Sequence, residues 1–209
     1  MKSSETMIIP EPSLRRLPLY HQILELEKEN GIEYISCSKI AEMLRFTSIQ
    51  VRKDLSYIDL SGTPKKGYKL NELKEKIEEF LGWDRMDEAF LVGTGNLGKA
   101  LMSYSEFKNK GLTITAAFDK NHKVTGTTLF GIPVFDISKL QELAYRMKTH
   151  IGIITVPAPE AQKIADIMVR SGIRGIWNFA PVRLTVPQDI IVSDVNLSSY
   201  LAVLSQKLK

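Results

Sequence analysis

Hydrophobic side chains in the first third of the chain recur every three or four residues, the spacing of helices that bury one face. This spacing predicts a first helix with its apolar face over residues 14–26, ended by Asn30 and Gly31. Two shorter helices are predicted within residues 36–46 and 47–57. Each has hydroxyl side chains that can cap its start, Ser36 or Ser38 for the first and Thr47 or Ser48 for the second.

A turn-forming segment follows these three helices. Residues 60–68 contain two glycines and a proline, which do not continue a helix. Residues 71–81 then return to a charged helical pattern that stops at Gly82. Two helices, a short turn, a third helix and a basic, glycine-containing hairpin, in this order, are typical of a winged helix-turn-helix.

After Glu88 the pattern changes to short apolar runs, which alternate with segments of helical spacing. The runs occupy residues 89–92, 112–118, 151–156, 175–179 and 190–195, and the main helical segments occupy residues 138–148 and 160–171. Wholly apolar strands that alternate with helices predict an α/β domain whose parallel sheet is covered on both faces. The boundary between the two parts is predicted at residues 82–87.

A glycine-rich turn joins the first of these strands to the next predicted helix. It reads Gly93, Thr94, Gly95, Asn96, Leu97 and Gly98. In a dinucleotide-binding turn the first glycine allows the tight bend, the second lets backbone N–H groups approach a pyrophosphate, and the third lets helix and strand pack closely. The positive end of the helix then faces the phosphates. A tight strand-to-helix turn without a ligand is the alternative.

Asp119 strengthens the case for a dinucleotide. It ends the second strand 21 positions after Gly98, near the spacing of roughly 20 for the acid that hydrogen-bonds an adenosine ribose. A carboxylate there favours NAD over NADP, although Lys120 and Lys123 weaken the preference. The sequence therefore predicts a Rossmann-like fold for this part of the chain.

Two proline-containing turns end later strands at the edge of the sheet where dinucleotides bind. The first includes Val156 and Pro157, and the second includes Asn178, Phe179 and Pro181. They are candidate cofactor contacts, and the alternative is that their prolines only terminate strands.

Charge is distributed unevenly along a chain with a net charge of +4. Residues 39–69 carry seven basic against three acidic side chains, whereas residues 71–84 carry two against five. The basic block contains the third helix, on which Gln50, Lys53 and Tyr57 share one face flanked by Arg52 and Ser56. Such side chains suit base edges and phosphates, so we expect a recognition helix, with a solvated amphipathic helix as the alternative.

Composition excludes several other classes. Hydrophobic residues make up 44% of the 209 residues, but no apolar stretch approaches the roughly 18 residues of a membrane span. Residues 1–12 show no secretory signal pattern, and the single cysteine, Cys37, fits a reducing cytoplasm. Three scattered histidines do not predict a metal site. About 125 residues after Arg85 leave little room for a substrate domain, so catalytic residues are not expected.

Taken together, these motifs resemble the Rex family of redox-sensing transcriptional repressors. The resemblance is carried, in order, by VRKDLSY at residues 51–57, the glycine turn at 93–98, TVP at 155–157 and GIRGI at 172–176 leading to NFAP at 178–181. It implies a cytoplasmic bacterial homodimer with a winged helix over residues 1–84, a Rossmann domain over 85–195 and a C-terminal helix over 196–209 that is exchanged between subunits. It also implies binding to a pseudo-palindromic double-stranded operator, NAD⁺ and NADH as ligands, and release from DNA when NADH binds.

The resemblance, with the motifs above, assigns residues to two sites. The expected cofactor contacts are Gly93, Thr94, Gly95, Asn96, Leu97, Gly98, Tyr104, Asp119, Lys120, Val156, Pro157, Asn178, Phe179 and Asp194. The expected DNA contacts are Thr47, Ser48, Gln50, Arg52, Lys53, Ser56, Tyr57, Lys65, Lys66 and Tyr68. Tyr104 and Asp194 are expected among the polar contacts near the nicotinamide.

The sequence departs from the family pattern at two positions, and two alternative functions are also compatible with it. The wing has Thr-Pro-Lys-Lys at residues 63–66 where relatives usually carry an arginine, and Gln22 stands where relatives can carry an arginine that partners the acid matching Asp194. The other functions are a small NAD-dependent dehydrogenase and a CoA-binding domain, the latter having no need of Asp119.

Overall fold

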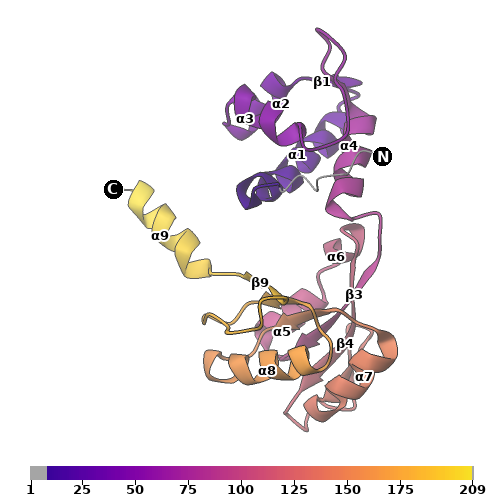
Figure 1. Cartoon of the computed structure of the whole chain (residues 1–209), viewed down its shortest axis with the longest axis vertical. Helices are drawn as coiled ribbons and strands as arrows, with labels where there is room; N and C mark the ends of the chain where they lie inside the picture. The colour runs from indigo at the N-terminus through magenta and orange to yellow at the C-terminus, as the bar shows by residue number, and fades with distance from the viewer. Residues whose placement is uncertain (1–8, 209) are drawn as a thin grey trace. The chain divides into compact units, whose positions relative to one another are not determined.

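The computed structural model describes residues 9–208 of the chain (Figure 1). Most of the segment in which the sequence predicts no secretory signal, residues 1–8, and the last residue of the predicted C-terminal helix, residue 209, lie outside the described residues. The chain divides into two compact units that meet between Asp84 and Arg85.

The first unit is mainly helical. Its elements are α1 (Glu11–Glu29), β1 (Tyr34–Ile35), α2 (Cys37–Leu44), α3 (Ser48–Leu55), β2 (Tyr68–Lys69) and α4 (Leu70–Leu81). Ser36 caps α2 by accepting a hydrogen bond from Lys39 N, and Thr47 caps α3 in the same way from Gln50 N. The structure thereby selects one of the two predicted capping residues at each helix.

The core of this unit lies between α1, α3 and α4. Leu17 and Leu24 of α1 are fully buried with Val51 of α3 and Ile77 of α4. The predicted hairpin is closed by a bridge between Thr63 and Gly67, and β2 then pairs antiparallel with β1. This arrangement is the predicted winged helix-turn-helix.

The second unit is built on a seven-stranded sheet. Its elements are β3 (Asp87–Val92), α5 (Asn96–Met102), α6 (Glu106–Asn109), β4 (Leu112–Asp119), β5 (Thr128–Leu129), β6 (Ile132–Asp136), the 3₁₀ helix η1 (Ile137–Lys139), α7 (Leu140–Met147), β7 (Ile151–Ile154), α8 (Ala158–Arg170), β8 (Gly175–Asn178), β9 (Ile191–Asp194) and α9 (Leu197–Lys207). The strand order is β5-β6-β4-β3-β7-β8-β9, with every neighbouring pair parallel except β5 and β6.

The predicted Rossmann-like sheet is confirmed. It is mostly parallel, and at its edge β5 and β6 add an antiparallel hairpin that the sequence pattern did not predict. Phe130 and Gly131 both have positive φ at its tip, as a two-residue hairpin turn requires. The sequence pattern missed β5 and β6 because a two-residue strand and a five-residue strand broken by Pro133 give little periodic signal.

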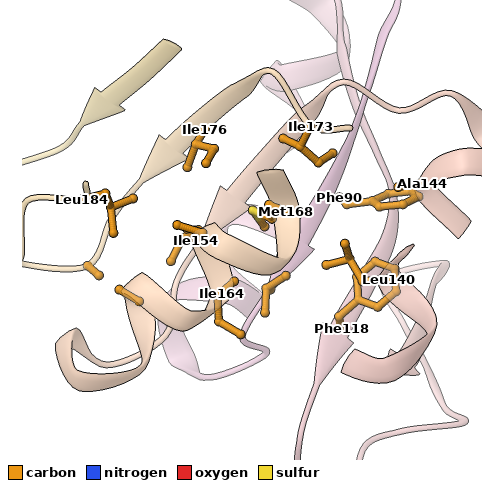
Figure 2. Close-up of a cluster of buried hydrophobic side chains, with 14 of the residues drawn as sticks. Phe90, Phe118, Leu140, Ala144, Ile154, Ile164, Met168, Ile173, Ile176 and Leu184 are labelled. Atoms are coloured by element: carbon orange, nitrogen blue, oxygen red, sulfur yellow. The ribbon is translucent and has the colours of Figure 1, made fainter. Parts of the chain in front are cut away.

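Helices cover both faces of this sheet. Leu140 of α7 and Ile164 and Met168 of α8 pack on one face against Phe118 and Ile154 of the strands (Figure 2). Met102 of α5 belongs to the core of the other face. The core thus fixes the sheet, and with it the loops at the ends of its strands.

The C-terminal helix, α9, differs from the other long helices in being almost uncovered. None of its residues is buried within the described chain, and Leu197, Leu201, Leu204 and Leu208 are 56–80% exposed. As for membranes, none of the helices described is both long enough and apolar enough to cross one.

Candidate functional site

The carboxyl ends of the parallel strands bring most of the predicted cofactor residues to one edge of the sheet. The glycine turn follows β3, Asp119 ends β4, and Val156 lies just after β7. Asn178 ends β8 and Asp194 ends β9, where the two residues are paired in the strand register. The strand order reverses between β3 and β7, and such a switch point is where dinucleotides bind in sheets of this kind.

The three glycines of the turn have three different surroundings. Gly93 has a φ of +103°, and an added Cβ would lie 2.9 Å from Val156 Cγ1. A Cβ at Gly98 would lie 2.0 Å from the Gly93 carbonyl oxygen, so the start of α5 packs directly on the turn. A Cβ at Gly95, by contrast, would meet nothing within 4 Å. Gly93 and Gly98 are therefore required by the fold, whereas Gly95 leaves open space for a ligand.

Thr94 and Asp119 are joined by two hydrogen bonds across this turn. Thr94 donates from its backbone N–H (2.7 Å) and from Oγ1 (2.6 Å) to Asp119 Oδ2, and Asn121 N donates to Oδ1 (2.9 Å). Burial on its own would raise the pKa of Asp119, but the hydrogen bonds from Thr94 and the neighbouring backbone lower it. Asp119 is thus held as a carboxylate at the edge of the sheet, and the Thr94 side chain holds it there.

A cavity of about 200 Å³ opens beside the glycine turn. The predicted residues that line it are Gly93, Gly95, Asp119, Lys120, Val156 and Pro157. The cavity is also lined by residues that were not predicted from the sequence: Val92, Ile137, Thr155, Glu160, Lys163, Ile164 and Ile167. The cavity has apolar walls and four charged residues, Asp119, Lys120, Glu160 and Lys163, of which Lys120 and Glu160 form an ion pair (3.2 Å). This combination suits a flat apolar ring attached to a polar sugar.

A signal for the missed residues was present in the sequence. Glu160, Lys163, Ile164 and Ile167 recur at three- and four-residue steps at the start of the predicted helix after Pro157. A helix that starts at the ligand edge presents the face of its first turns to that edge. Thr155 was equally visible, and its Oγ1 donates to the Gly93 carbonyl (2.6 Å), so it supports the turn from β7.

The Asn178 side chain holds the turn after β8 in place through hydrogen bonds. It is fully buried, and its Nδ2 donates both to the Val182 carbonyl and to Asp194 Oδ1, each at 2.8 Å. Its Oδ1 accepts from Ala180 N at 3.0 Å. Both amide hydrogens are therefore used within the protein. Asp194 lines a second cavity of about 320 Å³ together with the residues of this turn.

Tyr104 lies away from these cavities. It follows the C-terminal end of α5, whereas the glycine turn precedes the N-terminal end, and it lines a separate cavity of about 530 Å³. Aromatic rings connect Tyr104 to Phe107, Phe107 to Trp177, and Trp177 to Phe179 with centroid separations of 4.9–5.5 Å. Within one chain the structure does not bring Tyr104 to the glycine turn. Asn96 and Leu97 are exposed in the first turn of α5.

The predicted recognition helix ends at Leu55, so Ser56 and Tyr57 lie beyond it rather than on its face. Arg52, Lys53 and Ser56 are exposed, whereas Gln50, Ser48 and Tyr57 are half-buried. Thr47 uses its Oγ1 to cap the helix. The exposed positive charge of α3 is thus carried by Arg52 and Lys53, which stay candidate DNA contacts.

The hairpin that follows α3 exposes two further positive charges. Lys65 and Lys66 are exposed, and Lys66 Nζ lies 5.2 Å from the centre of the Tyr34 ring. Tyr68 is half-buried against the core of the unit, and this burial raises the pKa of its hydroxyl. Tyr68 therefore anchors the hairpin, and Lys65 and Lys66 form its exposed surface.

Among residues 9–208, no three His, Cys, Asp or Glu side chains gather closely enough to hold a metal ion. A winged helix-turn-helix joined to a Rossmann-like sheet with an open glycine turn defines a class of DNA-binding regulators that sense a nucleotide.

Comparison with known proteins gives the family. Residues 84–182 match the CoA binding domain model, and residues 8–56 match the model of a putative DNA-binding protein N-terminus. The redox-sensing transcriptional repressor Rex of Bacteroides fragilis is 44% identical over 200 residues, 96% of this chain and 91% of that one. The solved structure of RSP in complex with beta-NAD⁺ and operator DNA covers 97% of this chain and 94% of its own, with a TM-score of 0.91 and 35% identity. RSP in complex with beta-NADH gives a TM-score of 0.88 at 35% identity, over 97% of this chain and 95% of that one.

The chain belongs to the Rex family of redox-sensing transcriptional repressors. The predicted family and the regulatory, non-enzymatic class are thereby confirmed. Because these relatives are named as transcriptional repressors, the chain is not assigned as a dehydrogenase. The CoA binding domain model matches the Rossmann-like part of a chain that belongs to the Rex family.

Proposed function

We propose that this chain is a cytoplasmic homodimeric repressor that binds a pseudo-palindromic operator and leaves it when NADH binds. The observation that carries the proposal is the presence, in one chain, of an exposed basic helix and a glycine turn with open space at Gly95. RSP, 35% identical, has been solved both with beta-NAD⁺ and operator DNA and with beta-NADH, so a close relative binds the same three ligands.

The dinucleotide fits along the edge of the sheet in two halves. The cavity beside Asp119 and Lys120 would hold the adenosine, since its apolar walls suit a ring and the carboxylate suits a ribose. The backbone at Gly95 would face the pyrophosphate. The turn after β8 and Asp194 would receive the nicotinamide end, with Asn178 as the residue that fixes both.

NADH differs from NAD⁺ by a hydride on an uncharged nicotinamide ring. The chain has to bind the two forms differently in its DNA-bound and free states, because a ligand with equal affinity for both states shifts no equilibrium. Asp194 stands at the expected nicotinamide end, where a negative charge favours the positively charged ring of NAD⁺. This gives a charge-based reason for the NAD⁺-bound and NADH-bound chains to differ.

The helix α9 would complete a dimer. Its leucine face is uncovered in a unit whose sheet core is already closed, and a second copy offers the same unpaired face. Exchange of α9 between subunits would bury these side chains and place two recognition helices on one duplex. A two-fold symmetric protein of this kind reads a pseudo-palindromic site.

Electrophoretic mobility shift of DNA selected by the chain from a randomised pool tests the proposal directly. We expect a palindromic consensus, retention of the shifted band with NAD⁺ and loss of the band on titration with NADH. CoA at the same concentrations should leave the band unchanged. Failure to select any consensus, or equal responses to NADH and CoA, would contradict the proposed function.

The DNA contacts make a second prediction. Arg52→Ala or Lys53→Ala should weaken binding to the selected duplex. Loss of one phosphate contact should flatten the plot of log K against log salt by about one unit, whereas loss of a base contact should cost about 1–3 kcal/mol of discrimination. Lys139→Ala, an exposed lysine of the sheet unit paired with Glu142, is the matched control. Binding of both variants like wild type would assign DNA reading to another surface.

A further inference from the structure

The recognition helix carries a buried carboxylate whose partners all lie on α1. Asp54 is 1% exposed, although it directly follows the exposed Lys53. Arg16 donates from Nε to Asp54 Oδ2 (2.6 Å) and from a terminal nitrogen to Oδ1 (2.7 Å), and Tyr20 donates its hydroxyl to Oδ2. Arg16 also donates to Ser13 Oγ at 3.2 Å. We call Arg16, Tyr20 and Asp54 the α1–α3 clamp.

The clamp is ionic and directional. Burial on its own would raise the pKa of Asp54, but hydrogen bonds from Arg16 and Tyr20 lower it, and the same contact raises the pKa of Arg16. A bidentate pair between a guanidinium and a carboxylate fixes the relative orientation of its two planes. Hydrophobic burial, which holds Val51 and Leu55 of the same helix, has no preferred direction. The clamp therefore supplies the rotational constraint that the apolar contacts lack.

Helix geometry relates this constraint to the DNA-binding face. Successive residues of an α-helix are separated by about 100° of rotation, so Arg52 projects nearly opposite Asp54 and Lys53 projects to one side. The helix has only eight residues, and a small rotation about its axis would displace the ends of both long side chains. Fixing Asp54 against α1 thus fixes the direction in which Arg52 and Lys53 leave the protein surface.

We propose that Asp54, through the α1–α3 clamp, is a positioning residue for sequence-specific DNA reading. It contacts no DNA itself, and its role is to orient Arg52 and Lys53. The inference rests on the proposed DNA-binding function. It predicts that loosening the clamp reduces discrimination between DNA sequences more than it reduces general attraction to DNA, since phosphate contacts need charge but base contacts need register.

The test uses the full chain and two duplexes, one selected by the wild-type chain and one scrambled to the same length and composition. Asp54→Asn should lower the ratio of the two affinities about tenfold, a change of the size expected for one misplaced base contact. Affinity for the scrambled duplex and its salt dependence should stay near wild type. Binding of NADH, followed by its fluorescence, should also be unchanged. The matched control is Glu11→Gln, which removes an exposed ion pair with Arg15 on α1, the helix that carries Arg16 and Tyr20.

Asp54→Asn leaves Arg16 without its carboxylate and could unfold the protein, so a second variant tests the inference independently. The triple substitution Arg16→Met, Tyr20→Phe and Asp54→Leu replaces the whole clamp by apolar side chains, which often preserves or increases stability while removing the directional contacts. It should fold, as judged by circular dichroism, and show the same loss of discrimination. A folded variant with the wild-type ratio overturns the inference, as does collapse of both variants, which would make the clamp a requirement of folding only. Absence of any duplex selected by wild type would instead contradict the proposed function.

Discussion

Removal of residues 197–209 is expected to convert the dimer into a monomer or an aggregate and to lower operator affinity by orders of magnitude. Three leucines on one face of α9 and a fourth at its C-cap, Leu208, are exposed in the single chain, and burying each fully is worth about 2 kcal/mol. A monomer presents one recognition helix, so it loses the roughly 10²–10⁴-fold gain of two linked binding events. Sedimentation and operator binding of the truncated chain measure both effects.

Point substitutions separate the apolar face from the helix itself. Leu201→Glu with Leu204→Glu should dissociate the dimer, whereas Ser199→Glu with Gln206→Glu places the same charges on the side of α9 opposite the leucines and should leave it intact. NADH should no longer release DNA from the leucine variant even where NADH still binds, since no dimer is left to switch. A truncated chain that sediments as a stable dimer with a normal NADH response would remove α9 from the mechanism.

Alanine at Gly95 should weaken NADH binding about tenfold to a hundredfold, or about 1.4–2.8 kcal/mol, without changing the thermal stability of the protein. The added Cβ meets no protein atom within 4 Å, so the fold has no reason to resist it. The same atom would stand in the open space beside the cavity at Asp119, where the pyrophosphate is proposed to lie. Titration of NADH fluorescence and thermal unfolding give the two measurements.

Two other glycines serve as controls for this substitution. Gly98→Ala should destabilise the protein by about 1–3 kcal/mol, because its Cβ would lie 2.0 Å from the Gly93 carbonyl oxygen. Gly175→Ala should change neither property, because its Cβ would make only ordinary contacts at 3.9 and 4.0 Å. Wild-type NADH affinity in Gly95→Ala would show that the dinucleotide does not approach this turn.

The sequence by itself determined the two-part organisation, the three N-terminal helices and the main strands. Repeated local patterns carry this information, because burial of one helix face or of a whole strand leaves a regular spacing of apolar residues. The glycine turn and Asp119 were also predicted correctly from the sequence, as features of a strand-helix-strand unit. Gly98 is dictated by a close contact with the Gly93 carbonyl five positions earlier, Gly93 by its positive φ of +103°, and Asp119 by the length of one strand-helix-strand unit.

Only the tertiary structure shows which of these polar side chains are available to a ligand and which are already hydrogen-bonded within the protein. Thr94 and Asn178 are among the expected cofactor contacts, yet both side chains already have partners within the protein. The Thr94 hydroxyl donates to Asp119, and the Asn178 amide donates to the Val182 carbonyl and to Asp194. Asp54 directly follows the basic residues Arg52 and Lys53 in the sequence, but it is buried against Arg16, 38 positions away. No local pattern records such pairings, because they arise when distant segments meet and each buried polar group must find a partner.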